Sequence, residues 1–149
     1  MFFYDFYIKA LTFHIVYDII LLRGDVLIVK WNVDYYIKEN GESPVKEFIK
    51  TLPKKHRAKV FWEIDLLEEL GTTIKEPYAK PIQGKKYKGL WELRIQQGSD
   101  ASRVFYFLPV GNKFILLHGF VKKTNKTPAS ELETALSYMN DYKRGIENV

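Results

Sequence analysis

Three short strand-like runs, separated by clear turn signals, limit what this chain can fold into more than any other feature. The runs cover residues 90–96, 103–108 and 113–120. The two connections, 98–100 and 109–112, consist mostly of Gly, Ser, Asp, Asn and Pro. These residue types supply the backbone conformations and local hydrogen bonds that tight turns require. The pattern predicts three consecutive antiparallel strands.

Helical periodicity flanks these strands on both sides. Ser43 and Pro44 provide a cap and a first turn for a short helix, with apolar residues at helical spacing in Val45, Phe48, Ile49 and Leu52. Pro53 begins a second stripe that ends at Gly71 and consists of Val60, Phe61, Ile64, Leu67 and Leu70. After the strands, Thr127 and Pro128 open a helix whose apolar face carries Leu132, Ala135, Leu136 and Met139. Residues 26–35 begin with an apolar run and continue with apolar side chains at alternate positions, which predicts a first strand.

Length and composition predict one domain without thiol or metal chemistry. The chain has 149 residues, of which 46% are hydrophobic, and this is enough to build one core. It contains no cysteine, which suits a reducing cytoplasm. His14, His56 and His118 have no second ligand at helical spacing, so we expect no metal site and no cofactor.

The first 25 residues are rich in aromatic and aliphatic side chains but contain Asp5, Lys9, His14 and Asp18. These polar residues leave no apolar run near the roughly 20 residues that span a bilayer, and no cleavage signal follows. We therefore expect neither a signal peptide nor a membrane anchor. Residues 1–25 are interpreted either as an added element or as a translation start placed too far upstream, and residues 26–149 as the domain.

Positive charge is concentrated in one region of the chain. The segment from Lys75 to Lys126 contains 11 Lys and Arg residues but only three acidic ones, a net charge of +8, while the rest carries −3. A basic region on an otherwise slightly acidic protein favours an anionic partner, of which nucleic acid is the commonest. A solvated lysine-rich surface is the alternative.

Three sequence blocks resemble a known family. Residues 89–94 read GLWELR, residues 103–107 read RVFYF, and residues 117–124 read LHGFVKKT, followed by Lys126, Thr127 and Pro128. These blocks resemble, in the same order, the HigB-like and phage-derived Gp49-like branch of the RelE/ParE toxins. The resemblance covers about residues 30–142, including both helices before the strands.

This resemblance implies a fold and two alternative functions. The implied fold is α+β, with an N-terminal strand and a helical hairpin packed on a curved antiparallel sheet, followed by a C-terminal helix. The implied partner is a helix-turn-helix antitoxin. Many family members enter the ribosomal A site and cleave mRNA without a metal ion, whereas a ParE-like minority inhibits DNA gyrase. The +8 region and the ELR and KKT blocks favour the ribosome-dependent endonuclease.

Such a reaction needs a base for the 2′-OH, cations for the charged phosphorane and an acid for the leaving oxygen. Alternation along the strand predicts that Arg94 points away from the core, on a face that Arg103 shares. The resemblance transfers Arg94, Arg103, Lys122 and Lys123 as candidates. Glu92 is the nearest carboxylate base and His118 a candidate acid or base, so the catalytic candidates are Arg94, Arg103, Lys123, Glu92 and His118. The RNA-binding candidates are Lys122, Lys126, Lys85, Lys86, Lys88, Phe105 and Phe107. After Phe120 the alignment with the family's motif can shift by one residue, so the choice between Lys122 and Lys123 stays open.

Each candidate also has a structural interpretation. Arg94 could pair with Glu92 on the sheet surface, and the lysines could position RNA without reacting. A packed, hydrogen-bonded role is favoured for His118 over acid–base chemistry, because it lies within a predicted strand. Phe105 and Phe107 stack on bases if they and Arg103 face a groove, whereas the opposite register buries them.

Overall fold

The structure is a computed structural model that describes residues 20–22, 25–27 and 30–148. The interpretation of residues 1–25 as an added element or a misplaced start therefore lies almost wholly outside the described residues. Within them, β1 (Ile20–Leu22) and β2 (Asp25–Leu27) form an antiparallel pair. No helix in the described part of the chain is long and apolar enough to cross a membrane.

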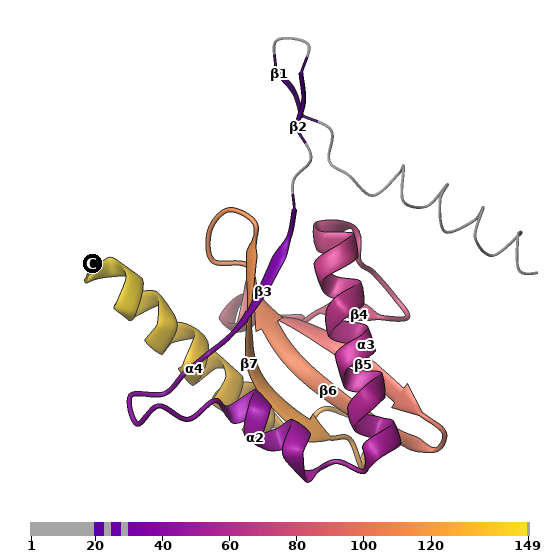
Figure 1. Ribbon diagram of the computed structural model, residues 1–149. Coiled ribbons are helices and arrows are strands. Elements are labelled where there is room, and N and C mark those ends of the chain that lie inside the picture. Colours follow the sequence, from indigo (N-terminus) through magenta and orange to yellow (C-terminus); the bar gives the residue numbers. More distant parts are fainter. Residues whose placement is uncertain (1–19, 23–24, 28–29, 149) are drawn as a thin grey trace, which may run out of the picture.

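A five-stranded sheet with the order β3-β7-β6-β5-β4 forms the centre of the fold (Figure 1). Its strands are β3 (Asn32–Tyr35), β4 (Ala79–Pro81), β5 (Trp91–Gln97), β6 (Asp100–Phe107) and β7 (Lys113–Val121). Strands β5, β6 and β7 pair antiparallel in sequence order. The predicted three-stranded meander is confirmed, and the fold class is α+β.

The two edges of the sheet differ from the sequence prediction. β3 runs parallel to β7, so the sheet is mixed and not wholly antiparallel. The single strand predicted over residues 26–35 is also wrong, because Asp25–Leu27 belongs to the β1–β2 pair and β3 begins only at Asn32. At the other edge, β4 pairs with β5. β4 lies between the second predicted helix and the first predicted strand, in a basic segment whose Pro, Gly and Lys residues predict a loop.

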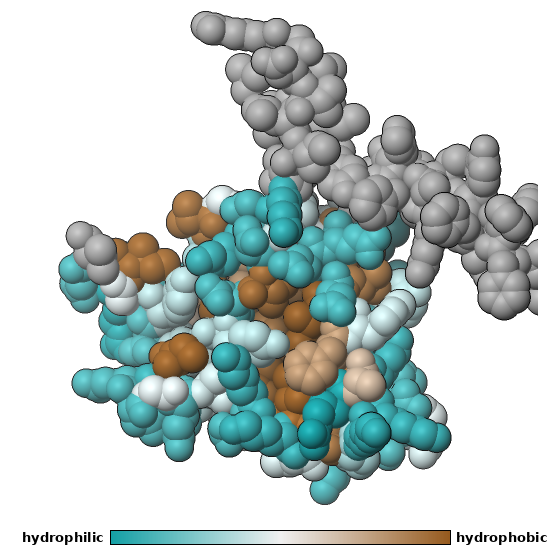
Figure 2. All heavy atoms as spheres, viewed as in Figure 1, coloured by the Kyte–Doolittle hydropathy of each residue, from teal (hydrophilic) through white to brown (hydrophobic). Residues whose placement is uncertain are grey.

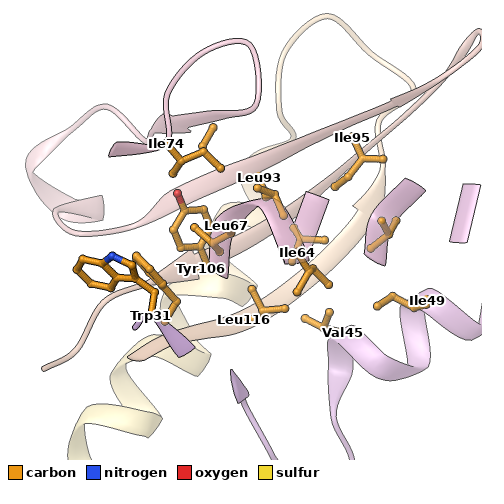
Figure 3. Packing of buried hydrophobic residues seen from close by; sticks show 14 of the residues in the cluster. Trp31, Val45, Ile49, Ile64, Leu67, Ile74, Leu93, Ile95, Tyr106 and Leu116 are labelled. Carbon is orange, nitrogen blue, oxygen red and sulfur yellow. The ribbon is translucent and has the colours of Figure 1, made fainter. Parts of the chain in front are cut away.

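Two helices cover one face of the sheet (Figure 1). They are α2 (Pro44–Thr51) and α3 (Lys54–Leu70), and the predicted cap is confirmed because the Lys46 amide donates to Ser43 Oγ at 3.4 Å. The core beneath them gathers aliphatic residues from both helices against the strands, around Tyr106 (Figure 3). Burial of this apolar area is the main driving force for folding.

The predicted stripe of α3 is partly wrong. Phe61 is 46% exposed, whereas His56 and Glu63 are buried. His56 Nε2 forms a 2.8 Å hydrogen bond with Ser102 Oγ, and Glu63 pairs with Lys59 at 2.9 Å. These partners satisfy His56 and one carboxylate oxygen of Glu63, whereas Oε2 of Glu63 is buried without a hydrogen-bond partner among the described residues. Hydrophobic residues are also visible in the centre of this face of the molecule (Figure 2).

The opposite face is covered by α4 (Ala129–Glu147), as the C-terminal periodicity predicts. Ala135 and Met139 are buried against β6 and β7, and Leu132 and Leu136 pack beside them. Near the other end of the helix, Tyr36 Oη donates to Asp141 Oδ2 at 2.6 Å. α4 lies against β7 and β6 and makes few contacts with β5 or β4, so it covers only part of this face.

Candidate functional site

The register of β5 and β6 places Arg94 directly opposite Arg103. Residues opposite each other in a β ladder project from the same side of the sheet. Glu92, two residues earlier on β5, projects from that side as well. Its Oε1 lies 3.7 Å from Nε of Arg94 and 3.7 Å from Nε of Arg103. The prediction that the two arginines share a face is confirmed, and so is the ion pair with Glu92.

The two arginines differ in exposure, however. Arg94 keeps 30% of its side chain exposed, whereas only 7% of the Arg103 side chain is exposed. The expectation that both lie on an open surface is wrong for Arg103, because β6 is the middle strand and α4 passes over its face. Burial lowers the pKa of the Arg103 guanidinium, and the nearby Glu92 carboxylate partly offsets this.

Arg103 has unused hydrogen-bonding capacity. Its Nη1 donates to the Ser102 carbonyl at 2.9 Å, but its buried Nε has no hydrogen-bond partner among the described residues. A buried donor without an acceptor costs roughly 1–3 kcal/mol, and more when it is charged. A guanidinium has five donors in a fixed plane that match the oxygens of a phosphate. Arg103 is therefore a phosphate-binding group with hydrogen-bonding capacity to spare, although its Nε itself is closed off from solvent.

Two lysines complete the positive charge of this cluster. Lys122 follows β7, and its amide donates to the Ala101 carbonyl at 2.8 Å, which holds it beside the start of β6. Its pKa is lowered, first by burial and then by Arg103, with smaller contributions from Arg94 and Lys80. Lys80 of β4 is the register partner of Glu92. We call Arg94, Arg103, Lys122, Lys80 and Glu92 the arginine cluster.

Sequence reasoning missed two charged residues next to Arg94, Lys80 and Glu76. Lys80 Nζ lies 3.4 Å from Glu76 Oε1, and Arg94 Nη1 lies 3.7 Å from Glu76 Oε2. Both residues belong to the segment predicted as a basic loop. Only the pairing of β4 with β5 brings them to Arg94, and the sequence carries no signal for that pairing.

Other predicted basic residues surround the cluster without joining it. Lys123 and Lys126 are exposed on the connection to α4. Lys122 lies near enough to Arg103 for the two charges to interact, and the assignment of Lys122 or Lys123 to RNA stays a prediction. Lys85, Lys86 and Lys88 lie in or next to a short 3-10 helix, η2 (Lys85–Tyr87), and are exposed. Lys86 pairs with Glu133 of α4 at 2.7 Å, which raises the pKa of Lys86.

His118 connects the sheet to α4. Its Nε2 contacts Glu131 Oε2, and its ring stacks near Phe105 and Phe120. The interpretation of His118 as a packed, hydrogen-bonded residue is thus confirmed. The Glu131 pairing fixes the start of α4 over β7.

Phe105 and Phe107 do share the face of Arg103, but the prediction that they stack on bases is wrong. Phe105 is fully buried and Phe107 is 2% exposed. Both belong to the hydrophobic core beneath α4. There the ring of Phe107 meets that of Tyr142 edge to face, with 5.6 Å between the ring centroids. The helix therefore fills the space that a base would need.

Comparison with known proteins gives a family. No curated protein matches the chain. The model of the family described as phage-derived protein Gp49-like matches residues 47–140, from α2 to α4, and this range contains every member of the arginine cluster. The chain therefore belongs to the phage-derived Gp49-like family, which is a family of RelE/ParE-like toxins.

Proposed function

We propose that this chain is the toxin of a type II toxin–antitoxin system and that it arrests translation by cleaving mRNA on the ribosome, in a reaction that needs no metal ion. The observation that carries the proposal is the buried Arg103 guanidinium, aligned with Arg94 and accompanied by Lys122. Family membership supports the toxin role. The nuclease activity rests on the chemistry that this cluster offers.

The arginine pair suits the charge that develops in RNA cleavage. When the ribose 2′-oxygen attacks the neighbouring phosphate, negative charge accumulates on the non-bridging oxygens. Arg94 and Arg103 present donors from two adjacent strands of one rigid sheet, so they need little reorganisation during the reaction. Their separation is set by the β ladder and by the shared contact with Glu92.

Lys122 is the proposed general acid. The bond from phosphorus to the 5′-oxygen breaks as the cyclic phosphate forms, and the leaving oxygen takes up a proton. Burial and the neighbouring cations lower the pKa of Lys122, which makes its ammonium a better proton donor. Glu92 is the carboxylate available to accept the proton of the 2′-OH, and it also orients both arginines.

An antitoxin is the expected partner in this system. A segment that neutralises the toxin at the arginine cluster must offer negative charge, because four of the five cluster residues are cationic. Binding of such a segment weakens as salt is added. An affinity that does not change between low and high ionic strength would place the antitoxin on the apolar helices instead.

The direct test is primer extension on mRNA translated by purified ribosomes. We expect cuts in the A-site codon with the wild-type protein and none without ribosomes. In cells that express the protein without an antitoxin, amino-acid incorporation should fall before DNA synthesis. If ribosomes show no cut and DNA synthesis fails first, the nuclease proposal is wrong, and inhibition of DNA gyrase takes its place.

A further inference from the structure

Two aromatic side chains are exposed at the β4 edge of the sheet. Trp62 of α3 is 47% exposed, and Tyr78, which immediately precedes β4, is 37% exposed. Their ring centroids lie 6.1 Å apart, with the planes tilted by 58°. Packing against the core explains most of the large aromatics in the described part of the chain, but it does not explain this pair.

The pair is directly connected to the arginine cluster. The backbone amide of Arg94 donates to the Tyr78 carbonyl at 2.7 Å. Glu76, two residues before Tyr78, lies 3.7 Å from the Arg94 guanidinium and 3.4 Å from Lys80. Since β4 is an edge strand, Tyr78 stands where the two faces of the sheet meet. A chain bound at Arg94 can therefore reach the aromatic pair over this edge.

A cation also accompanies the aromatic pair. Lys59 Nζ lies 3.6 Å from the centroid of the Trp62 ring, and an ion pair with the buried Glu63 at 2.9 Å holds it there. Positive charge beside exposed aromatic rings is the combination that sites for single-stranded nucleic acid use, with cations for the backbone and rings for the bases.

We propose that Trp62 and Tyr78 form a base-stacking platform for the nucleotide next to the one whose phosphate lies at Arg94 and Arg103. This inference rests on the proposed RNA substrate. The platform takes the role that the sequence assigned to Phe105 and Phe107. Stacking tolerates every base, because each base has a π face. The platform therefore strengthens mRNA binding without selecting a codon.

The test measures cleavage of mRNA on programmed ribosomes by the variants Trp62→Ala, Trp62→Phe and Tyr78→Ala. Loss of one stacking ring should lower kcat/KM between about fivefold and about 100-fold, chiefly through KM because the rings do not touch the reacting atoms. Trp62→Phe should recover most of this loss. Phe61→Ala is the matched control, since Phe61 is the adjacent residue on α3 and is 46% exposed. It should change kcat/KM less than twofold.

Two results would overturn the platform while the proposed function stands. One is equal activity of Trp62→Ala and Phe61→Ala. The other is wild-type cleavage by Trp62→Ala together with escape from the antitoxin, which would make the aromatic pair a protein interface. Melting temperatures of all variants should match the wild type, because the replaced rings are exposed.

A second measurement separates the platform from the nuclease activity. It compares binding of a short single-stranded RNA with binding of the same strand lacking its bases. The wild type should prefer the strand with bases, and Trp62→Ala should lose that preference. If the wild type cuts nothing on ribosomes but shows this preference, the nuclease proposal fails and the platform remains. If the wild type binds both strands equally, the platform is overturned.

Discussion

Replacement of Arg103 by methionine distinguishes between two roles of this residue, one in catalysis and one in holding the sheet together. The variant removes the buried charge but keeps an unbranched apolar stem of similar length. Loss of one preorganised donor to the developing oxyanion typically costs about 3–4 kcal/mol, so cleavage on programmed ribosomes should slow by about 100-fold or more. Arg103→Lys should recover only part of this loss, because a single ammonium lacks the planar fork.

Stability should behave differently from activity. The substitution removes one hydrogen bond, from the charged Nη1 to the Ser102 carbonyl, worth about 1.5–3 kcal/mol. It also removes a buried Nε without a hydrogen-bond partner in the described structure, and Glu92 retains Arg94 at 3.7 Å. These opposing effects should leave the free energy of unfolding within about 1 kcal/mol of the wild type, a shift in Tm of about 4 °C at most.

A structural arginine would give another result. Breaking a buried ion pair that the fold depends on costs about 3–5 kcal/mol, which corresponds to a fall in Tm of roughly 6–20 °C for a chain of this size. Thermal unfolding followed by circular dichroism measures this shift. If Arg103→Met loses activity and Tm together by such amounts, the assignment of Arg103 to phosphate stabilisation is wrong.

Three further predictions follow from described side chains. If Lys122 is the general acid, cleavage should decline as pH rises through its lowered pKa, below the ordinary lysine value of 10.5, and Lys122→Arg should move the decline in the pH–rate profile to higher pH. Gly71→Ala should lower Tm by several degrees, because φ is +55° and the added Cβ would lie 2.1 Å from the Trp31 indole nitrogen; an unchanged Tm would contradict this close approach. Burial raises the pKa of Glu63 above 4.5 despite Lys59, so the stability that this carboxyl contributes is present below pH 4.5 and is lost as pH rises through the raised value. Glu63→Gln should therefore make Tm less dependent on pH as pH rises above 4.5, and identical pH profiles for the two proteins would refute the assignment.

Local signals in the sequence were sufficient for the centre of the fold. The turn residues between the strands predict β5, β6 and β7, and the apolar spacing after Pro128 predicts α4. The edges of the sheet depend on contacts between distant segments. β4 has only three residues, one of them Pro81, and shows no alternation that could reveal its pairing with β5. The parallel direction of β3 follows from where α2 and α3 return the chain, and this cannot be read from β3 itself.

The candidate site was predictable to a similar extent. Strand alternation places Arg94 and Glu92 on one side, and the turn length sets Arg103 opposite Arg94. The exposure of these side chains depends on tertiary packing, because α4 buries Phe105 and Arg103 lies in the middle strand of the sheet, whereas Arg94 remains accessible. Helix packing is a tertiary effect, and it decides burial on a sheet face that is only partly covered.

The parallel pairing of β3 with β7 also sets an order in which the protein can fold during synthesis. Asn32 pairs with Lys113, so β3 has no partner until β7 has left the ribosome. Strand pairing across such a sequence separation is slow, because the intervening chain must first be ordered. β7 also precedes Lys122 and α4 in the chain. A nascent chain that stops before β7 therefore lacks both the completed sheet and the last cation of the arginine cluster, so the cluster is assembled only after β7 and Lys122 have been synthesised.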